Sequence, residues 1–201
     1  MNYFVTAIDT DSGKTIVSAI LCEALRADYW KPVQSGELDN SDTMKVKSLV
    51  SNEITVFHKE TYGLTQPYSP HKSAALDGLE IDPQQFVLPD TNNNLIIEGA
   101  GGLMVPLNNS FLVIDLIKQL NAEVILVSQN YLGSINHTIL SAQILKQYQI
   151  PVAGIIFNGD KEPYSEDFIL QYTGIKLLGH IPTCNSIAKS TVIEAGEHIS
   201  L

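Results

Sequence analysis

Short apolar runs that do not alternate with polar residues recur along the 201-residue chain, and they limit its fold more than any other feature. A strand buried on both faces gives such a run, because neither of its faces meets water. The runs predict strands at residues 2–8, 28–34, 94–98, 123–129, 151–159 and 176–181. Helical apolar spacing predicts helices at residues 14–27, 110–120, 134–149 and 164–174. This alternation predicts one α/β domain over residues 1–201, with a mostly parallel twisted sheet and helices on both faces.

Ligands of such sheets gather at the carboxyl ends of the strands. Polar residues stand at these places in the sequence: Asp9-Thr10-Asp11, Gln34-Ser35-Gly36, Glu98-Gly99, Ser128-Gln129-Asn130 and Asn158-Gly159. We therefore expect the functional site at this edge of the sheet. Residues 52–90 are less regular, and their prolines and short helix-like pieces predict excursions over the sheet face. The tail from residue 183 onward is not placed by its pattern.

The stretch TAIDTDSGKT, residues 6–15, joins the first predicted strand to the first predicted helix. Free N–H groups and the helix dipole at a helix start favour phosphate. Lys14 could neutralise terminal phosphates, and the Thr15 hydroxyl could ligate Mg²⁺. The standard loop has a glycine five residues before Gly13, where this chain has Ile8. The alternative is a plain strand-to-helix turn with an exposed lysine, but the strand and helix around it favour phosphate binding.

Two further residues carry charge where the pattern predicts strands. Glu98 ends an apolar strand just before three glycines within four residues, so it could reach a metal held by Thr15, or could simply end the strand. Lys31 lies inside a strand-like run, where a buried charge is costly unless it is paired. It could meet charge on a transferred phosphoryl group, or could point to water from an edge strand.

Other polar residues allow two interpretations from the sequence alone. Ser41 and Asp42 begin a predicted helix, and capping is the simpler role for both. Asn158 ends an apolar strand, where it could read a base edge or shape a turn with Gly159. His71 and His137 lack evident catalytic partners, which favours structural or surface roles.

The charge balance limits the partners that this chain can have. A net charge of −10 and a pI of about 4.8 argue against nucleic acid, although a local pocket can still be positive. The cysteines, Cys22 and Cys184, form no metal or CxxC pattern, which favours free thiols in a reducing compartment. No apolar run is long enough for a membrane span, and the N-terminus lacks the basic start of a signal peptide. We expect a cytoplasmic protein that binds no membrane.

Seven motifs in order resemble the dethiobiotin synthetase family over nearly the whole chain: FVTAIDTDSGKT, KPVQSG, NSDT, SPHKSA, IIEGAGG, LGSINH and IIFNGD. The resemblance implies an ATP-dependent ligase of biotin biosynthesis with a P-loop NTPase fold. In the implied reaction, 7,8-diaminononanoate takes up CO₂ (or bicarbonate) as an N-carbamate, which ATP phosphorylates to a carbamic–phosphoric anhydride. The second amine then closes the ring, giving dethiobiotin, ADP and phosphate.

The resemblance also implies a role for each matching residue. Asp11, Ser12, Gly13, Lys14 and Thr15 would bind ATP, and Thr15, Asp42 and Glu98 would hold Mg²⁺, so Asp42 would do more than cap a helix. Lys14 and Lys31 would be catalytic, with Lys31 meeting the carbamate and the γ-phosphate. The diamine or its carbamate would contact a set from several motifs: Thr10, Lys31, Ser35, Gly133 and Asn136.

Gly133 and Asn136 stand in LGSINH, a segment that in the family receives the substrate carboxylate across a dimer interface, so the resemblance implies a homodimer. Asn158 and Pro182 would flank the adenine. The family loop is one residue longer than the standard loop, so Ala7 replaces its first glycine, at a cost of about 1 kcal/mol if that position needs a positive φ.

Two rivals remain, one from the same ATPase class and one from a different class. One is an amide synthetase of the cobyrinate type. The other is a dimerising ATP switch of the partition or septum-placement kind, whose loop usually carries an extra lysine near its start. Residues 7–11 contain no lysine, which favours the synthetase.

Overall fold

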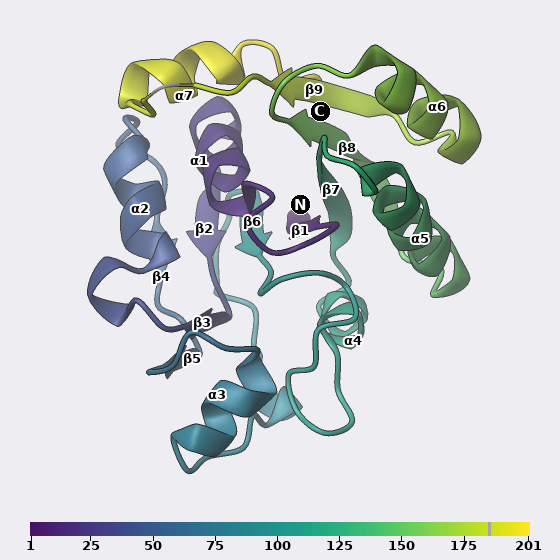
Figure 1. Cartoon of the computed structure of the whole chain (residues 1–201). Helices are drawn as coiled ribbons and strands as arrows, with labels where there is room; N and C mark the ends of the chain where they lie inside the picture. Colours follow the sequence, from purple (N-terminus) through teal and green to yellow (C-terminus); the bar gives the residue numbers. More distant parts are fainter. Residues whose placement is uncertain (185) are drawn as a thin grey trace.

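The computed structural model describes residues 1–184 and 186–201. Within this part of the chain, one parallel sheet has the strand order β4-β2-β6-β1-β7-β8-β9 (Figure 1). Its strands are β1 (Asn2–Ala7), β2 (Asp28–Trp30), β4 (Phe57–His58), β6 (Leu95–Glu98), β7 (Glu123–Gln129), β8 (Val152–Asn158) and β9 (Leu177–Ile181). The predicted α/β fold with a mostly parallel sheet is therefore confirmed.

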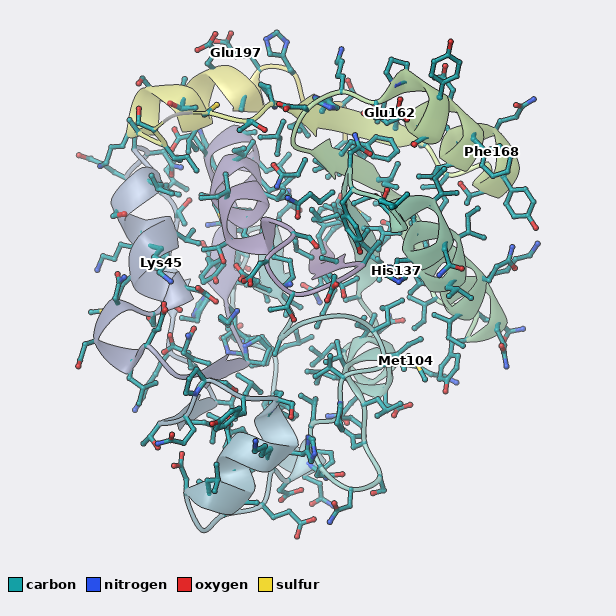
Figure 2. The ribbon with its side chains drawn as sticks, viewed as in Figure 1. Lys45, Met104, His137, Glu162, Phe168 and Glu197 are labelled. Atoms are coloured by element: carbon teal, nitrogen blue, oxygen red, sulfur yellow. The ribbon has the colours of Figure 1, made fainter. Side chains whose placement is uncertain are left out.

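Helices cover both faces of this sheet and enclose two hydrophobic cores. Because neighbouring side chains on a strand point to opposite faces, Phe4 lies in one core and Val5 in the other. One face carries α1 (Lys14–Leu25), α2 (Asp42–Leu49) and α7 (Lys189–Gly196). The other carries α3 (Pro70–Leu76), α4 (Val113–Gln119), α5 (Ser134–Gln147) and α6 (Pro163–Thr173). Side chains fill the space between these layers (Figure 2).

The predicted strand at 28–34 is wrong as one continuous strand. β2 ends at Trp30, and the chain then enters a second, two-stranded sheet of β3 (Val33–Ser35) and β5 (Tyr62–Leu64). Pro32 causes the break, since it has no N–H for the main sheet, and its carbonyl accepts instead from the amides of Thr61 and Tyr62, both at 3.0 Å. Lys31 therefore lies at the junction of the two sheets.

The region that the sequence left irregular contributes more than loops. β4 forms an edge of the main sheet, β5 forms the second sheet with β3, and α3 packs beside that sheet (Figure 1). The region also contains the short helix η2 (Pro83–Gln85), and η1 (Leu38–Asn40) precedes α2. The tail that the pattern did not place forms α7, which packs on α1 through the fully buried Val192. No helix in the described part of the chain has the length and hydropathy to span a membrane.

Candidate active site

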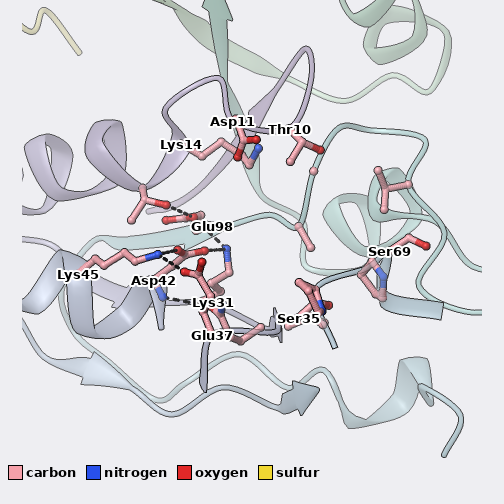
Figure 3. A pocket seen from close by; sticks show the side chains of 18 of the residues that line it. Thr10, Asp11, Lys14, Lys31, Ser35, Glu37, Asp42, Lys45, Ser69 and Glu98 are labelled. Carbon is pink, nitrogen blue, oxygen red and sulfur yellow. Dashed lines mark hydrogen bonds and ion pairs between the residues drawn. The ribbon is translucent and has the colours of Figure 1, made fainter. Parts of the chain in front are cut away.

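The loop between β1 and α1 has the shape of an anion-binding turn. Gly13 caps α1 with a φ of 89°, and Asp11 is also left-handed, with a φ of 57°. The Ser12 hydroxyl donates to the Asp9 carbonyl at 3.1 Å, and Lys14 Nζ donates to the same carbonyl at 3.2 Å. These hydrogen bonds hold the loop in a tight turn, and the start of α1 lines the adjoining cavity, where Figure 3 shows Thr10, Asp11 and Lys14.

Lys14 is mostly buried at the bottom of this turn. Burial lowers its pKa, and the charge of Lys31 acts in the same direction, whereas Glu98 and Asp42 oppose the shift. A bound polyphosphate would place negative charge next to Lys14 and favour its charged form. This electrostatic arrangement favours an anionic ligand over a neutral one.

Glu98 ends β6 in the middle of the sheet and is almost completely buried. Its Oε1 accepts hydrogen bonds from the Thr15 hydroxyl and from Lys31 Nζ, both at 2.9 Å. Its Oε2 accepts from the Tyr29 hydroxyl, also at 2.9 Å. Burial and the neighbouring Glu98 carboxylate together raise the pKa of Tyr29 well above its ordinary value, so Tyr29 stays a donor. These contacts join α1, β2 and β6 at one carboxylate.

Lys31 pairs with two carboxylates, so the alternative of an edge-strand lysine in water is wrong. Its Nζ lies 2.6 Å from Asp42 Oδ2 and 2.9 Å from Glu98 Oε1 (Figure 3). Burial would lower the pKa of Lys31, but Glu98 and Asp42 outweigh it and raise this pKa. Lys31 is therefore a charged ammonium in the site, as pairing of a buried charge requires.

At the start of α2, two neighbouring residues have different roles: one caps the helix and the other contacts Lys31. Ser41 is the N-cap, and its hydroxyl accepts from the Met44 amide at 3.3 Å. Asp42 is the first residue of the helix, and its side chain points to Lys31. Burial would raise the pKa of Asp42, but Lys31 and then Lys45 outweigh it, so this pKa is lowered. Ser41 thus confirms the capping interpretation, whereas the Asp42 carboxylate belongs to the site.

These side chains line one cavity of about 750 Å³, which runs from the loop toward β3 and α3. Among the residues predicted from the sequence, it brings together Thr10, Asp11, Gly13, Lys14, Thr15, Lys31, Ser35, Asp42 and Glu98. A cavity of this size holds a ligand larger than phosphate alone. The cavity therefore provides room for a second ligand beside the phosphate turn.

The other predicted residues lie outside this cavity. Asn158 donates through Nδ2 to the Ser12 carbonyl at 3.0 Å, behind the loop. Pro182 lines a separate cavity of about 530 Å³ with Asp160, Lys161, His180 and His198. Gly133 is the exposed N-cap of α5, with a φ of 108°, and Asn136 is exposed in its first turn.

The structure adds residues that the sequence analysis missed. Tyr29 donates to Glu98 at 2.9 Å. Gln34, which the sequence had placed only at a strand end, accepts from the Asp42 amide through Oε1 at 3.1 Å. Lys45 lies 2.6 Å from Glu37 and 3.5 Å from Asp42, and both Lys45 and Glu37 line the cavity. Lys45 stands three residues after Asp42, so helical spacing could have indicated it. Tyr29 offered no such signal, because an aromatic residue in an apolar strand is typical of a core.

A phosphate-type turn between β1 and α1, next to an acidic strand end in a parallel sheet, defines a P-loop NTPase. Solved structures of that class share the fold. The ParA family ATPase from Chlorobium tepidum superposes with a TM-score of 0.60 over 98% of this chain and 99% of its own, at 13% identity. MinD from Pyrococcus horikoshii, complexed with Mg-ADP, gives 0.59 over 98% and 95%, at 14% identity. At these identities the likeness shows the fold alone.

Sequence comparison decides the family. The model of a family described as an AAA domain matches residues 1–191. The ATP-dependent dethiobiotin synthetase BioD of Cytophaga hutchinsonii is 54% identical over 94% of this chain and 92% of its own. The same enzyme of Rhodopseudomonas palustris is 45% identical, over 89% and 84%. The chain belongs to the ATP-dependent dethiobiotin synthetase family.

Proposed function

We propose that this protein is an ATP-dependent cyclo-ligase that converts 7,8-diaminononanoate and CO₂ into dethiobiotin. The observation that carries the proposal is a cavity in which the phosphate turn meets the Lys31 ammonium, with room beside them for the diamine. The similarity to named dethiobiotin synthetases over most of both chains supports this choice of substrate.

The chemistry needs placement and charge compensation more than a side-chain nucleophile. One amine adds to CO₂ and loses a proton, giving an N-carbamate. A carbamate oxygen attacks the γ-phosphorus of ATP and ADP leaves, which gives the mixed anhydride. The second amine attacks the carbonyl carbon of the anhydride and phosphate leaves, so a cyclic urea remains.

The turn and the start of α1 would bind the triphosphate. Backbone N–H groups from Asp11 through Thr15 would donate to phosphate oxygens, and Gly13 lets the chain pass close to them. Lys14 would offset charge as the γ-phosphoryl group is transferred. On the opposite wall of the cavity, Ser35 would position the carbamate, while Thr10 would contact it from the loop.

Mg²⁺ fits the donor set that the site presents. Thr15, Asp42 and Glu98 offer one hydroxyl and two carboxylates, the hard oxygen ligands that Mg²⁺ takes alongside nucleotide phosphates. The Lys31 ammonium already lies between Asp42 and Glu98, so the site accommodates positive charge there. When bound, Mg²⁺ would neutralise charge on the β- and γ-phosphates.

The substrate carboxylate would be received by a second copy of the chain. Gly133 and Asn136 are exposed and lie outside the cavity of their own chain, at an α5 start whose free N–H groups suit a carboxylate. A homodimer that places this helix start over the partner's cavity would complete the site.

The base of the nucleotide would lie on the other side of the loop. Asn158 ends β8 next to Gly13, and Pro182 lines a separate cavity just after β9. These positions suit a base whose phosphates extend over the loop, with Asn158 reading the adenine edge and Pro182 covering its ring. In the described chain both cysteines are free, which supports a reducing, cytoplasmic location.

Lys31→Ala tests the division between nucleotide and carbamate sites. We expect turnover to be abolished while ADP binding, measured by calorimetry, largely survives, because Lys31 contacts Asp42 and Glu98 and not the loop. Lys72→Ala is the matched control, since Lys72 packs on Tyr68 at the cavity wall without joining the carboxylate pair. Loss of ADP binding in folded Lys31→Ala protein would instead assign Lys31 to the nucleotide.

A further inference from the structure

Tyr29 occupies the middle of β2 with no exposed surface. Its ring packs in the core between the sheet and α1, with the Phe57 ring centroid 6.2 Å away. Only its hydroxyl reaches a charged group, and it does so at 2.9 Å from Glu98 Oε2. A buried carboxylate oxygen needs such a donor, because leaving it unpaired costs the full penalty of desolvation.

The two oxygens of Glu98 therefore have different surroundings. Oε2 faces the core and accepts from Tyr29, while Oε1 faces the cavity and accepts from Thr15 and Lys31. A carboxylate fixed at one oxygen cannot rotate freely about its terminal torsion. Its other oxygen is then presented in one direction, toward the Thr15 hydroxyl.

We propose that Tyr29 is a positioning residue for the metal site, which holds Glu98 so that Oε1 faces the cation beside Thr15. This inference rests on the proposed function, in which Thr15, Asp42 and Glu98 hold Mg²⁺. Groups that orient metal ligands through hydrogen bonds set metal affinity, and their removal costs about 10- to 100-fold. Tyr29 touches neither substrate nor metal, so it acts through Glu98.

Loss of the hydroxyl would change the position of Glu98 without opening a large cavity. In Tyr29→Phe, the ring still fills its place in the core, but Oε2 loses its donor. Oε1 keeps its donors Thr15 and Lys31, but the carboxylate is no longer fixed at both oxygens, so it turns about its terminal torsion and no longer presents Oε1 in one direction. We therefore expect weaker metal binding with the fold retained.

The test titrates Mn²⁺ into the protein–ADP complex and follows the free ion by electron paramagnetic resonance. We expect the Mn²⁺ dissociation constant to rise about 10- to 100-fold in Tyr29→Phe. Tyr3→Phe is the matched control, because it removes a hydroxyl from another buried strand tyrosine that contacts only Met1 sulfur through that group. In steady-state assays, the KM for Mg²⁺ should rise while the KM for the diamine at saturating Mg²⁺ stays near the wild-type value.

A second variant, Tyr29→para-aminophenylalanine, keeps the ring and a donor at the same position. We expect it to restore Mn²⁺ binding to within threefold of wild type, and it carries the test alone if Tyr29→Phe does not fold. A dissociation constant within twofold of wild type in folded Tyr29→Phe, or a tenfold loss in the donor-bearing variant, overturns the proposal. Mn²⁺ binding that depends on the Tyr29 hydroxyl, together with no diamine-dependent phosphate release by the wild-type protein, would refute the proposed function. The positioning role of Tyr29 would still stand in that case.

Discussion

At the scale of single residues, Ala7 replaces the first glycine of the family loop, and its position at the end of β1 explains why an alanine is tolerated there. Ala7 is the last residue of β1, pairs with Val127 in the sheet and is fully buried. The positive φ angles of the loop fall on Asp11 and Gly13 instead. Ala7 therefore stays in extended backbone, where a side chain is tolerated, and the penalty considered for a left-handed alanine does not apply.

Gly13, by contrast, cannot be replaced without consequence. Its φ is 89°, and a Cβ built there would lie 2.2 Å from Asn158 Nδ2. We expect Gly13→Ala to weaken ADP binding at least tenfold, because a left-handed alanine costs about 1–2 kcal/mol and Asn158 must also move. Calorimetric titration with ADP measures this change.

Ala7→Gly, at the end of the strand before the loop, is the matched control, and it should leave the ADP affinity within about twofold while lowering stability by about 0.5–1 kcal/mol. Equal loss of ADP affinity in both variants would contradict this account of the loop.

Sequence patterns singled out two charged residues of the candidate site, because charges in apolar runs are conspicuous, although they left the role of Lys31 open. Glu98 and Lys31 were visible in this way, and they do lie together. The sequence pattern alone could not assign a role to Asp42, because an aspartate that caps a helix and one that binds a metal look the same in a sequence. The sequence did not indicate Tyr29 as a site residue, because only the register of β2 against β6 shows that its hydroxyl donates to Glu98.

At the scale of elements, the pattern predicted most strands of the main sheet, including β9 at one edge, but missed β4 at the other edge. β7 agrees with the predicted residues 123–129, since a strand buried on both faces is apolar throughout. β4 was missed because it has only two residues and lies at the edge of the sheet. Its position depends on contacts with distant residues, which a local pattern does not record.

One of these contacts is the carboxylate of Asp28, at the start of β2. It accepts from the Val56 amide at 3.0 Å, from His58 at 3.3 Å, from Thr91 at 2.6 Å and from Asn93 at 3.0 Å. Burial would raise the pKa of Asp28, but the hydrogen bonds, led by those from Asn93 and Thr91, outweigh it and lower this pKa. Through these hydrogen bonds, Asp28 holds β4 and the segment before β6 next to β2.

This arrangement predicts a specific dependence of stability on pH. Because the folded-state pKa of Asp28 is lowered, its contribution is complete above the unfolded value of about 3.9 and is lost as pH falls through the folded value. Asp28→Asn should lower the unfolding free energy at pH 7 by about 1–3 kcal/mol. The difference from wild type should shrink below about pH 4, as urea unfolding at each pH would show.

Asp167→Asn, at an exposed position of α6, is the control for simple loss of charge. A difference between wild type and Asp28→Asn that stays constant from pH 5 to pH 3 would contradict the role of an ionised Asp28.

At the scale of the whole molecule, charged side chains of both signs gather in one cavity of an acidic protein. The net charge is −10, and Lys14, Lys31 and Lys45 line this cavity together with four carboxylates, those of Asp11, Glu37, Asp42 and Glu98. Three ammonium groups beside one phosphate turn suit a small anionic ligand such as ATP, whereas the acidic net charge argues against the extended backbone of a nucleic acid. The fold is shared with partition and septum-placement ATPases, so the fold alone could not have decided the activity.

The proposed homodimer makes its own prediction, because Asn136 does not line the cavity of its own chain. Asn136→Ala should raise the KM for the diamine about 10-fold or more, with the KM for ATP little changed, since a hydrogen bond to a charged group is lost. Gln143→Ala, exposed on the same helix, is the control. A monomer in sedimentation, or an unchanged diamine KM, would remove Asn136 from the substrate site.

The central claim is that ATP cleavage is tied to ring closure of the diamine. Phosphate release from ATP should be measured with and without 7,8-diaminononanoate and bicarbonate, in the presence of Mg²⁺. The account predicts release only when both are present, with dethiobiotin formed in equal amount. Release that ignores the diamine but rises with DNA or lipid vesicles would contradict it and identify an ATP switch instead.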